Sequence, residues 1–199
     1  TTQLSDSCKK VVAVELDTRL KPVLEQTLDG KENVKIIWGD ILKIDLKSIF
    51  AEEFCDCKTV NICANLPYYI TSPVIMMLLE SRLPVNTITV MVQKEAADRL
   101  CAKVGSREAG AVTVAVNYYA EAHTLFGVPR TSFLPSPNVD SAVIKLQVRK
   151  NPPIEVKDEK MFFGIVKACF AQRRKILLNT LCNTMGIQKD VLRKALDSV

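Results

Sequence analysis

The sequence predicts an α/β fold, in which an open sheet with crossover connections is followed by a small helical domain. Two observations support this prediction. Short apolar runs alternate with segments of helical spacing from the N-terminus onward, as they do in sheets whose strands are joined by helices. After the segment Asn151-Pro152-Pro153 the strand signal stops and helical periodicity continues. We therefore expect one domain over residues 1–150 and a second, helical one over residues 151–199.

The individual elements follow from the period of the apolar residues. The first apolar run ends in acids and is typical of a buried parallel strand. Strands are predicted over residues 11–17, 34–40, 59–64, 87–92, 122–128 and 142–148. Helices are predicted over residues 20–28, 73–83, 94–101 and 109–119. We expect Ser72 to be the N-cap of the helix that Pro73 opens.

The composition is that of an ordinary globular protein with a mildly basic balance. The chain is 48% hydrophobic and carries a formal net charge of +5, which permits a nucleic-acid partner without requiring one. No apolar stretch is long enough to span a membrane, and the first residues have no signal-peptide pattern. We expect a cytoplasmic monomer that does not associate with a membrane.

The seven cysteines do not form a metal-binding pattern. They are scattered without a Cys-x-x-Cys pair, and His123 is the single histidine, so a zinc site would lack ligands. We expect no metal. We interpret the cysteines as reduced thiols of a cytosolic protein, most of them buried.

Polar residues at the ends of three successive strands predict a ligand site. These residues are Glu15, Asp40 and Asn65, and ligands of open α/β sheets bind beyond the carboxyl ends of the strands. Taken singly, each acid is more often a surface or capping residue. The repetition at three strand ends carries the prediction.

The segment Asn65-Leu66-Pro67-Tyr68 is the most informative motif for chemistry. An exocyclic adenine amine is a poor nucleophile because its lone pair is delocalised into the ring. Acceptors that hold both N–H bonds can steer that lone pair toward a sulfonium methyl, and the Asn65 side chain with the Leu66 or Pro67 carbonyl could do so. Tyr68 could stack on the base. The alternative is a simple N-cap and turn, which Asn and Pro also favour.

Residues 65–73 are similar to the amine-binding motif of the rRNA adenine N6-methyltransferases. Three further segments resemble the small-subunit (16S) rRNA adenine N6,N6-dimethyltransferases, or dimethyladenosine transferases, and occur in that family's order. They are residues 92–100, 133–143 and 170–175. The resemblance covers essentially the whole chain. It implies a Rossmann-like class I S-adenosylmethionine-dependent methyltransferase sheet with a small C-terminal helical domain.

The resemblance also implies a reaction and a partner. The reaction is transfer of methyl groups from S-adenosylmethionine to two adjacent adenines near the 3′ end of small-subunit rRNA, and the partner is the small ribosomal subunit. Glu15 matches the acid that receives the cofactor ribose hydroxyls. Asp40 matches the acid that contacts the cofactor adenine, with Ile41 packing near that ring.

Residues that contact the substrate are implied in the same way. Asn65, Leu66, Pro67 and Tyr68 match the catalytic motif, and Asn65 is counted among the cofactor contacts too. Phe133 matches an aromatic residue that packs on the flipped base, although an aromatic residue in a proline-rich loop is often a core residue. The cations Arg173, Arg174 and Lys175 could contact rRNA phosphates; their alternatives are a solvated helix surface or pairing within the protein.

The chain departs from the family at its start. Family members have a first strand and a glycine-rich loop before the segment that matches Thr1-Thr2-Gln3-Leu4, and the loop lets backbone approach the cofactor. With that strand and loop missing, and with a C-terminal domain that we read as incomplete, we expect residues 1–199 alone to bind the cofactor weakly and to be inactive.

Three other functions stay open at this stage. One is a large-subunit macrolide-resistance adenine methyltransferase, against which the Gln172-Arg173-Arg174-Lys175 element argues. Another is a non-catalytic rRNA-binding or ribosome-assembly factor. The third is a packing module without RNA affinity, for which a salt titration against rRNA would be flat.

Overall fold

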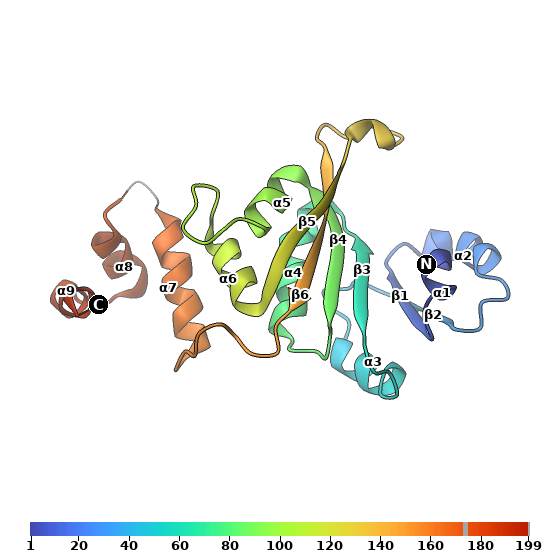
Figure 1. The fold of residues 1–199 in the computed structure, drawn as a ribbon, viewed down its shortest axis with the longest axis horizontal. Helices are drawn as coiled ribbons and strands as arrows, with labels where there is room; N and C mark the ends of the chain where they lie inside the picture. The colour runs from blue at the N-terminus through green and yellow to red at the C-terminus, as the bar shows by residue number, and fades with distance from the viewer. Residues whose placement is uncertain (173–174, 199) are drawn as a thin grey trace. The chain divides into compact units, whose positions relative to one another are not determined.

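The computed structural model describes residues 1–172 and 175–198. The chain divides into two compact units, which are considered separately. The first unit consists of Thr1–Val60 and Ile70–Val85, and the second of Asn61–Tyr69 with the described residues from Asn86 onward. Figure 1 shows the elements of both units.

The first unit contains a small parallel sheet. Strand β1 (Val11–Glu15) pairs with β2 (Val34–Trp38) in a register that runs from Val11 opposite Val34 to Glu15 opposite Trp38. The short helix α1 (Thr2–Ser5) precedes the sheet, and η1 (Thr18–Leu20) and α2 (Lys21–Thr27) connect its strands. Both strands lie within the segments predicted from the sequence, and each ends two residues earlier than predicted.

Helix α3 (Leu46–Glu53) was not predicted from the apolar spacing. Asp45 caps it by accepting hydrogen bonds from the N–H groups of Lys47 at 3.0 Å and Ser48 at 3.2 Å. A carboxylate in this position satisfies donors of the first turn that have no partner inside the helix. Asp45 was therefore the available signal for the start of this helix.

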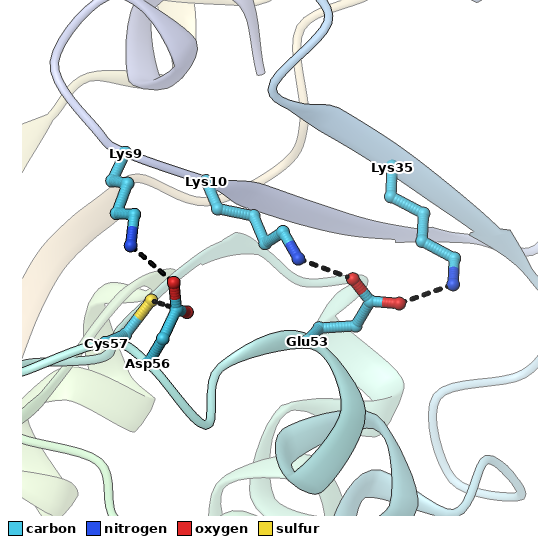
Figure 2. Close-up of polar contacts among 6 residues, drawn as sticks. All are labelled: Lys9, Lys10, Lys35, Glu53, Asp56 and Cys57. Atoms are coloured by element: carbon cyan, nitrogen blue, oxygen red, sulfur yellow. Dashed lines mark hydrogen bonds and ion pairs between the residues drawn. The ribbon is translucent and has the colours of Figure 1, made fainter.

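Ion pairs attach the end of α3 to the β1–β2 sheet (Figure 2). Glu53 Oε2 accepts a hydrogen bond from Lys10 Nζ at 2.9 Å, and Glu53 Oε1 accepts one from Lys35 Nζ. Lys10 directly precedes β1 and Lys35 lies in β2, so one carboxylate connects the start of β1 with β2. Lys9 pairs with Asp56 beyond the helix.

The predicted N-cap of helix α4 (Thr71–Glu80), Ser72, is wrong. Its N-cap is Ile70, and Ser72 lies inside the first turn. Pro73 occupies the third helical position, where a missing N–H costs no intrahelical hydrogen bond, so the helix can begin two residues before the proline. Its apolar side chains are buried, among them Val74 and Ile75 at 1% and 0% exposure.

The second unit is built on a sheet of four strands in the order β3-β4-β6-β5. The pairing of β3 with β4 is parallel, whereas β6 is antiparallel to both β4 and β5. The strands are β3 (Asn61–Asn65), β4 (Thr87–Gln93), β5 (Ala120–Val128) and β6 (Ser141–Val148). All four agree with the predicted strands to within two residues at either end.

The core of this sheet is formed by cross-strand pairs of β4 and β6. Ile88 lies opposite Leu146, and Val90 lies opposite Ile144. These four side chains are at most 1% exposed, as expected for alternate residues on the buried face of a sheet. Helices α5 (Lys94–Leu100) and α6 (Ala111–Tyr119) connect β4 to β5, close to their predicted positions.

The described C-terminal residues are helical, as predicted from their periodicity. The helices are α7 (Glu159–Ala171), α8 (Leu177–Met185) and α9 (Lys189–Asp197). Tyr118 and Tyr119 of α6 pack against Phe162 and Phe163 of α7, with ring centroids 5.3–5.5 Å apart. The two tyrosines are buried packing residues, at 4% and 5% exposure. A domain boundary near residue 151 stays a prediction.

The expected burial of the cysteines is wrong. None of the seven, all of which lie in described segments, is buried; Cys8, Cys55 and Cys63 are exposed. Cys63 lies at an exposed position of β3, where alternate side chains point away from the packed face.

Within the described part of the chain, no three or more His, Cys, Asp or Glu side chains form a group that could hold a metal ion. No described helix has the length and apolar character needed to cross a membrane.

Candidate functional site

Glu15 and Asp40 lie at the same edge of the β1–β2 sheet. Glu15 is the last residue of β1 and lies opposite Trp38. The backbone N–H of Gly39 donates to the carbonyl oxygen of Glu15 at 2.8 Å, which extends the pairing to the residue before Asp40. Because the strands are parallel, this edge is the carboxyl edge of the sheet, where α/β sheets bind ligands.

The Glu15 carboxylate keeps one oxygen available. Oε1 accepts a hydrogen bond from the backbone N–H of Asp17 at 2.8 Å, whereas Oε2 has no hydrogen-bond partner among the residues that the structure describes. Asp17 itself is occupied by Arg19, whose guanidinium donates to it and lowers the pKa of Asp17 to about 2. Glu15 is therefore the half-buried acid with acceptor capacity at the end of β1.

Asp40 is also half-buried, and part of its hydrogen-bonding capacity is taken up by the turn in which it lies. Its Oδ1 accepts a hydrogen bond from the Leu42 N–H at 3.0 Å, and Lys43 Nζ lies 3.8 Å from Oδ2. A contact of this length with an exposed lysine is weak. The half-buried Ile41 follows directly in the chain. This edge thus carries two acceptors for ligand hydroxyl or amine groups, beside an apolar side chain.

The second unit contains the Asn65-Leu66-Pro67-Tyr68 motif, which begins at the carboxyl end of β3. Asn65 pairs with Met91 of β4 through the backbone, and its exposed side-chain amide has no hydrogen-bond partner in the described segments. Leu66 is 8% exposed and anchors the motif. Pro67 is exposed, and Tyr68 begins the turn η2 (Tyr68–Ile70).

This geometry disfavours the simple capping interpretation of Asn65. The N-cap of α4 is Ile70, and η2 starts three residues after Asn65. The asparagine amide therefore caps the N-terminus of neither α4 nor η2. Its side-chain oxygen remains available to accept a hydrogen bond from a ligand amine.

Tyr68 is held by a residue that the sequence analysis did not single out. The hydroxyl oxygen of Tyr68 lies 2.8 Å from Oγ of Ser141, the first residue of β6. Ser141 is 73 positions further along the chain, so local sequence reasoning could not find the contact. Its only signal was its place in the 133–143 segment of the family resemblance.

Phe133 lies in the loop between β5 and β6 and is half-buried. The loop begins with η3 (Arg130–Ser132), and the Phe133 N–H donates to the Arg130 carbonyl at 3.3 Å. The Arg130 N–H donates to Asp140 Oδ1 at 2.9 Å, which ties the two ends of the loop together.

Lys175 lies between α7 and α8 and is exposed. Figure 1 shows these two helices on the other side of α6 from β3, so the structure does not group Lys175 with Asn65. Arg173 and Arg174, the neighbouring predicted RNA contacts, lie outside the described residues.

Comparison with known proteins identifies the family. The sequence profile of the family described as Ribosomal RNA adenine dimethylase matches residues 1–197. A protein of Geobacillus thermodenitrificans named Ribosomal RNA small subunit methyltransferase A is 52% identical over all of this chain and 69% of its own length. The protein of the same name from Bacillus licheniformis is 52% identical over 96% of this chain and 65% of its own.

Two solved structures are similar to this fold. A dimethyladenosine transferase from Plasmodium falciparum superposes with a TM-score of 0.75 at 27% identity, over 90% of this chain and 62% of its own. The 23S rRNA methyltransferase ErmE superposes with a TM-score of 0.70 at 25% identity, over 98% of this chain and 74% of its own. Both bear out the predicted Rossmann-like methyltransferase fold.

The chain spans about two thirds of the length of the curated relatives that it matches. The family match extends over nearly all of its residues, and the relatives share about half of them. The chain therefore belongs to the ribosomal RNA adenine dimethylase family.

Proposed function

We propose that the protein is an S-adenosylmethionine-dependent methyltransferase that dimethylates N6 of two adjacent adenines near the 3′ end of small-subunit rRNA. The observation that carries the proposal is Asn65 at the carboxyl end of β3. Its side-chain amide has no hydrogen-bond partner among the described residues, and Tyr68 is fixed three residues later. The relatives at 52% identity, which are named for the small subunit, favour that substrate over large-subunit rRNA.

The acids of the β1–β2 edge fit the hydroxyl and amine groups of the cofactor. Oε2 of Glu15 can accept hydrogen bonds from ribose hydroxyls, and the Asp40 carboxylate can accept one from the cofactor adenine amine. Ile41 offers the ring an apolar contact. S-adenosylmethionine, when bound, supplies an electrophilic methyl group on a positively charged sulfur.

The motif residues act on the target adenine by positioning it. The Asn65 side-chain oxygen and the Leu66 or Pro67 carbonyl accept the two N6 hydrogens, so that the nitrogen lone pair faces the methyl group. Each of the two transfers would form a nitrogen–carbon bond as the sulfur–carbon bond of one cofactor molecule breaks, and would release one amine proton to water. Tyr68 and Phe133 contact the faces of the base, and Lys175, with Arg173 and Arg174, contacts rRNA phosphates.

The proposed setting follows from the same reasoning. The substrate is part of the small ribosomal subunit, so the protein is proposed to work in the cytoplasm. We further propose that it acts as a monomer, which sedimentation of the purified protein with and without subunits would test.

The decisive test is methylation of small ribosomal subunits that lack these modifications. The protein is incubated with the subunits and S-adenosylmethionine, and the rRNA nucleosides are quantified by mass spectrometry. We expect N6,N6-dimethyladenosine to form, and Asn65→Ala to lower its rate by about 100-fold or more, as for loss of a preorganised transition-state contact.

Asn61→Ala is the matched control at the other end of β3. The Asn61 side chain accepts a hydrogen bond from Thr87 Oγ1 at 2.7 Å, so its loss weakens the strand pair without touching the motif. Its methylation rate should stay close to that of the unmutated protein. Subunit binding without any methyl transfer would instead support a non-catalytic assembly factor.

A further inference from the structure

Ser141 is the first residue of β6, an inner strand of the second unit's sheet, and is held there by pairing on both sides. It is 1% exposed, and its backbone lies opposite Gln93 of β4 on one side and Val128 of β5 on the other. Pairing on both sides fixes the direction of its side chain. The Oγ atom that meets the Tyr68 hydroxyl is therefore a fixed point of the fold.

The segment that carries Tyr68 has less support of its own. Tyr68 is half-buried in the short turn η2, between the exposed Pro67 and Tyr69, which is 81% exposed. A short 3-10 turn has poorer hydrogen-bond geometry than an α-helix. The 2.8 Å contact with Ser141 is thus the long-range polar contact that can set the orientation of the Tyr68 ring.

Asp140, the residue before Ser141, holds the loop that carries Phe133. Asp140 Oδ1 accepts from the Arg130 N–H at 2.9 Å, and Ser136 Oγ donates to the Arg130 carbonyl at 2.9 Å. The Asp140 carbonyl also accepts a hydrogen bond from the Lys94 N–H at the start of α5. One end of the loop is therefore fastened to the sheet through Asp140.

We propose that Asp140 and Ser141 are positioning residues for the target base: Ser141 orients the Tyr68 ring and Asp140 fixes the Phe133 loop. Two consecutive residues at the start of β6 thereby place both aromatic side chains from one rigid point. The inference rests on the proposed methyl transfer, because it assigns a role in presenting the adenine. Neither residue contacts the reacting atoms in this account.

The test is a double-mutant cycle on the Tyr68–Ser141 contact. Ser141→Ala and Tyr68→Phe each remove one hydroxyl, and each should lower kcat about three- to tenfold, the range expected for one hydrogen bond. The KM for S-adenosylmethionine should not change. Because both substitutions delete the same bond, the double variant should be no slower than the slower single variant.

A purely structural role would give a different pattern. Ser141→Thr keeps a hydroxyl and should recover most of the lost kcat, after rates are normalised to the cofactor-binding sites measured in each preparation. Ser81→Ala is the control, since Ser81 Oγ donates to the Leu78 carbonyl at 2.7 Å away from the motif; its kcat should be unchanged. If Ser141→Ala does not fold, Tyr68→Phe with Tyr68→Leu as comparison still separates the hydroxyl from the ring.

For Asp140, Asp140→Asn retains an acceptor for the Arg130 N–H and should be close to normal, whereas Asp140→Ala should lower kcat about three- to tenfold. Normal kcat in Ser141→Ala and Tyr68→Phe, or losses that multiply in the double variant, would overturn the positioning role while leaving the methyltransferase function intact. Failure of the unmutated protein to methylate would contradict the proposed function itself.

Discussion

The β1–β2 sheet and the β4–β6 strand pair are held together by different kinds of contact. Across residues 1–59, all of which the structure describes, Ser5 is the one buried residue. In β4 and β6, by contrast, Ile88 and Leu146 lie opposite each other at 1% and 0% exposure. The first region combines half-buried apolar side chains with ion pairs such as those of Glu53, whereas the second has fully buried, close-packed apolar side chains.

The difference bears on how the two halves of the proposed chemistry are supported. The acids assigned to the cofactor, Glu15 and Asp40, lie on the lightly packed sheet. Asn65 and Ser141 lie on strands that pair directly with the largely buried strand β4. We infer that the target-base residues are held more rigidly than the cofactor acids are in this structure, since local stability follows buried apolar contact.

The largest expected effect is on stability and comes from the β4–β6 core. Leu146→Ala should lower the free energy of unfolding by about 2–5 kcal/mol, because it removes a fully buried side chain and leaves a cavity. Val12→Ala in the partly exposed β1 should cost less than about 1.5 kcal/mol. Urea unfolding, monitored by hydrogen exchange of the amides in each sheet, measures both losses of free energy. Equal losses for the two variants would contradict the comparison.

A smaller effect should follow from the Glu53 ion pairs. Glu53→Gln removes the charge that attracts Lys10 and Lys35, so amides of α3 should exchange faster with solvent. The difference should shrink at high salt, because exposed lysines are readily screened. Glu52→Gln is the matched control, since Glu52 is an exposed neighbour; an equal change in both variants would show that the ion pairs are not responsible.

The same carboxylates give the first unit a dependence on acid. Hydrogen bonds from Lys35 and Lys10 lower the pKa of Glu53 from its ordinary 4.5, and the hydrogen bond from Lys9 lowers the pKa of Asp56 from 3.8. Groups with a lowered pKa stabilise the fold above their ordinary pKa, and that stabilisation disappears as pH falls through the lowered value. The protection of the α3 amides, expressed relative to their intrinsic exchange rates at each pH, should thus fall selectively below about pH 4, and less so in Glu53→Gln.

The smallest expected effect concerns the reactivity of the thiols. Alkylation of a small fraction of the cysteines should leave the stability of the fold unchanged. Burial raises the pKa of the Cys101 thiol and of the Cys169 thiol, and the thiolate is the reactive form. Cys8, Cys55 and Cys63 are exposed. Alkylation at pH 8 followed by peptide mass spectrometry should label these three at least about tenfold faster than Cys101; uniform labelling would contradict the burial pattern.

The elements that the sequence predicted best are those whose signal is local. The apolar runs of β1 and β4 identify strands because their pattern depends on neighbouring residues alone. The motif at Asn65 was found for the same reason. Its position at the end of β3, outside both helix starts, then distinguished it from an ordinary turn.

The features that sequence reasoning missed depend on partners distant in the chain or on the choice among alternative caps. Helix α3 is fastened by Lys10 and Lys35, which lie 43 and 18 positions before Glu53. Ser72 has a good capping side chain, yet the helix begins at Thr71. The Tyr68–Ser141 contact joins the turn η2 to the start of β6, which only the folded sheet brings together.

The central claim is that the β1–β2 edge serves the cofactor and the β3 motif serves the target amine. Steady-state kinetics of Glu15→Gln and Asn65→Ala on unmethylated small subunits test it most directly. We predict that Glu15→Gln raises the KM for S-adenosylmethionine about tenfold or more with kcat little changed, and that Asn65→Ala lowers kcat about 100-fold with that KM unchanged. A loss of kcat alone in Glu15→Gln, or a change in the cofactor KM alone in Asn65→Ala, would contradict this division of roles.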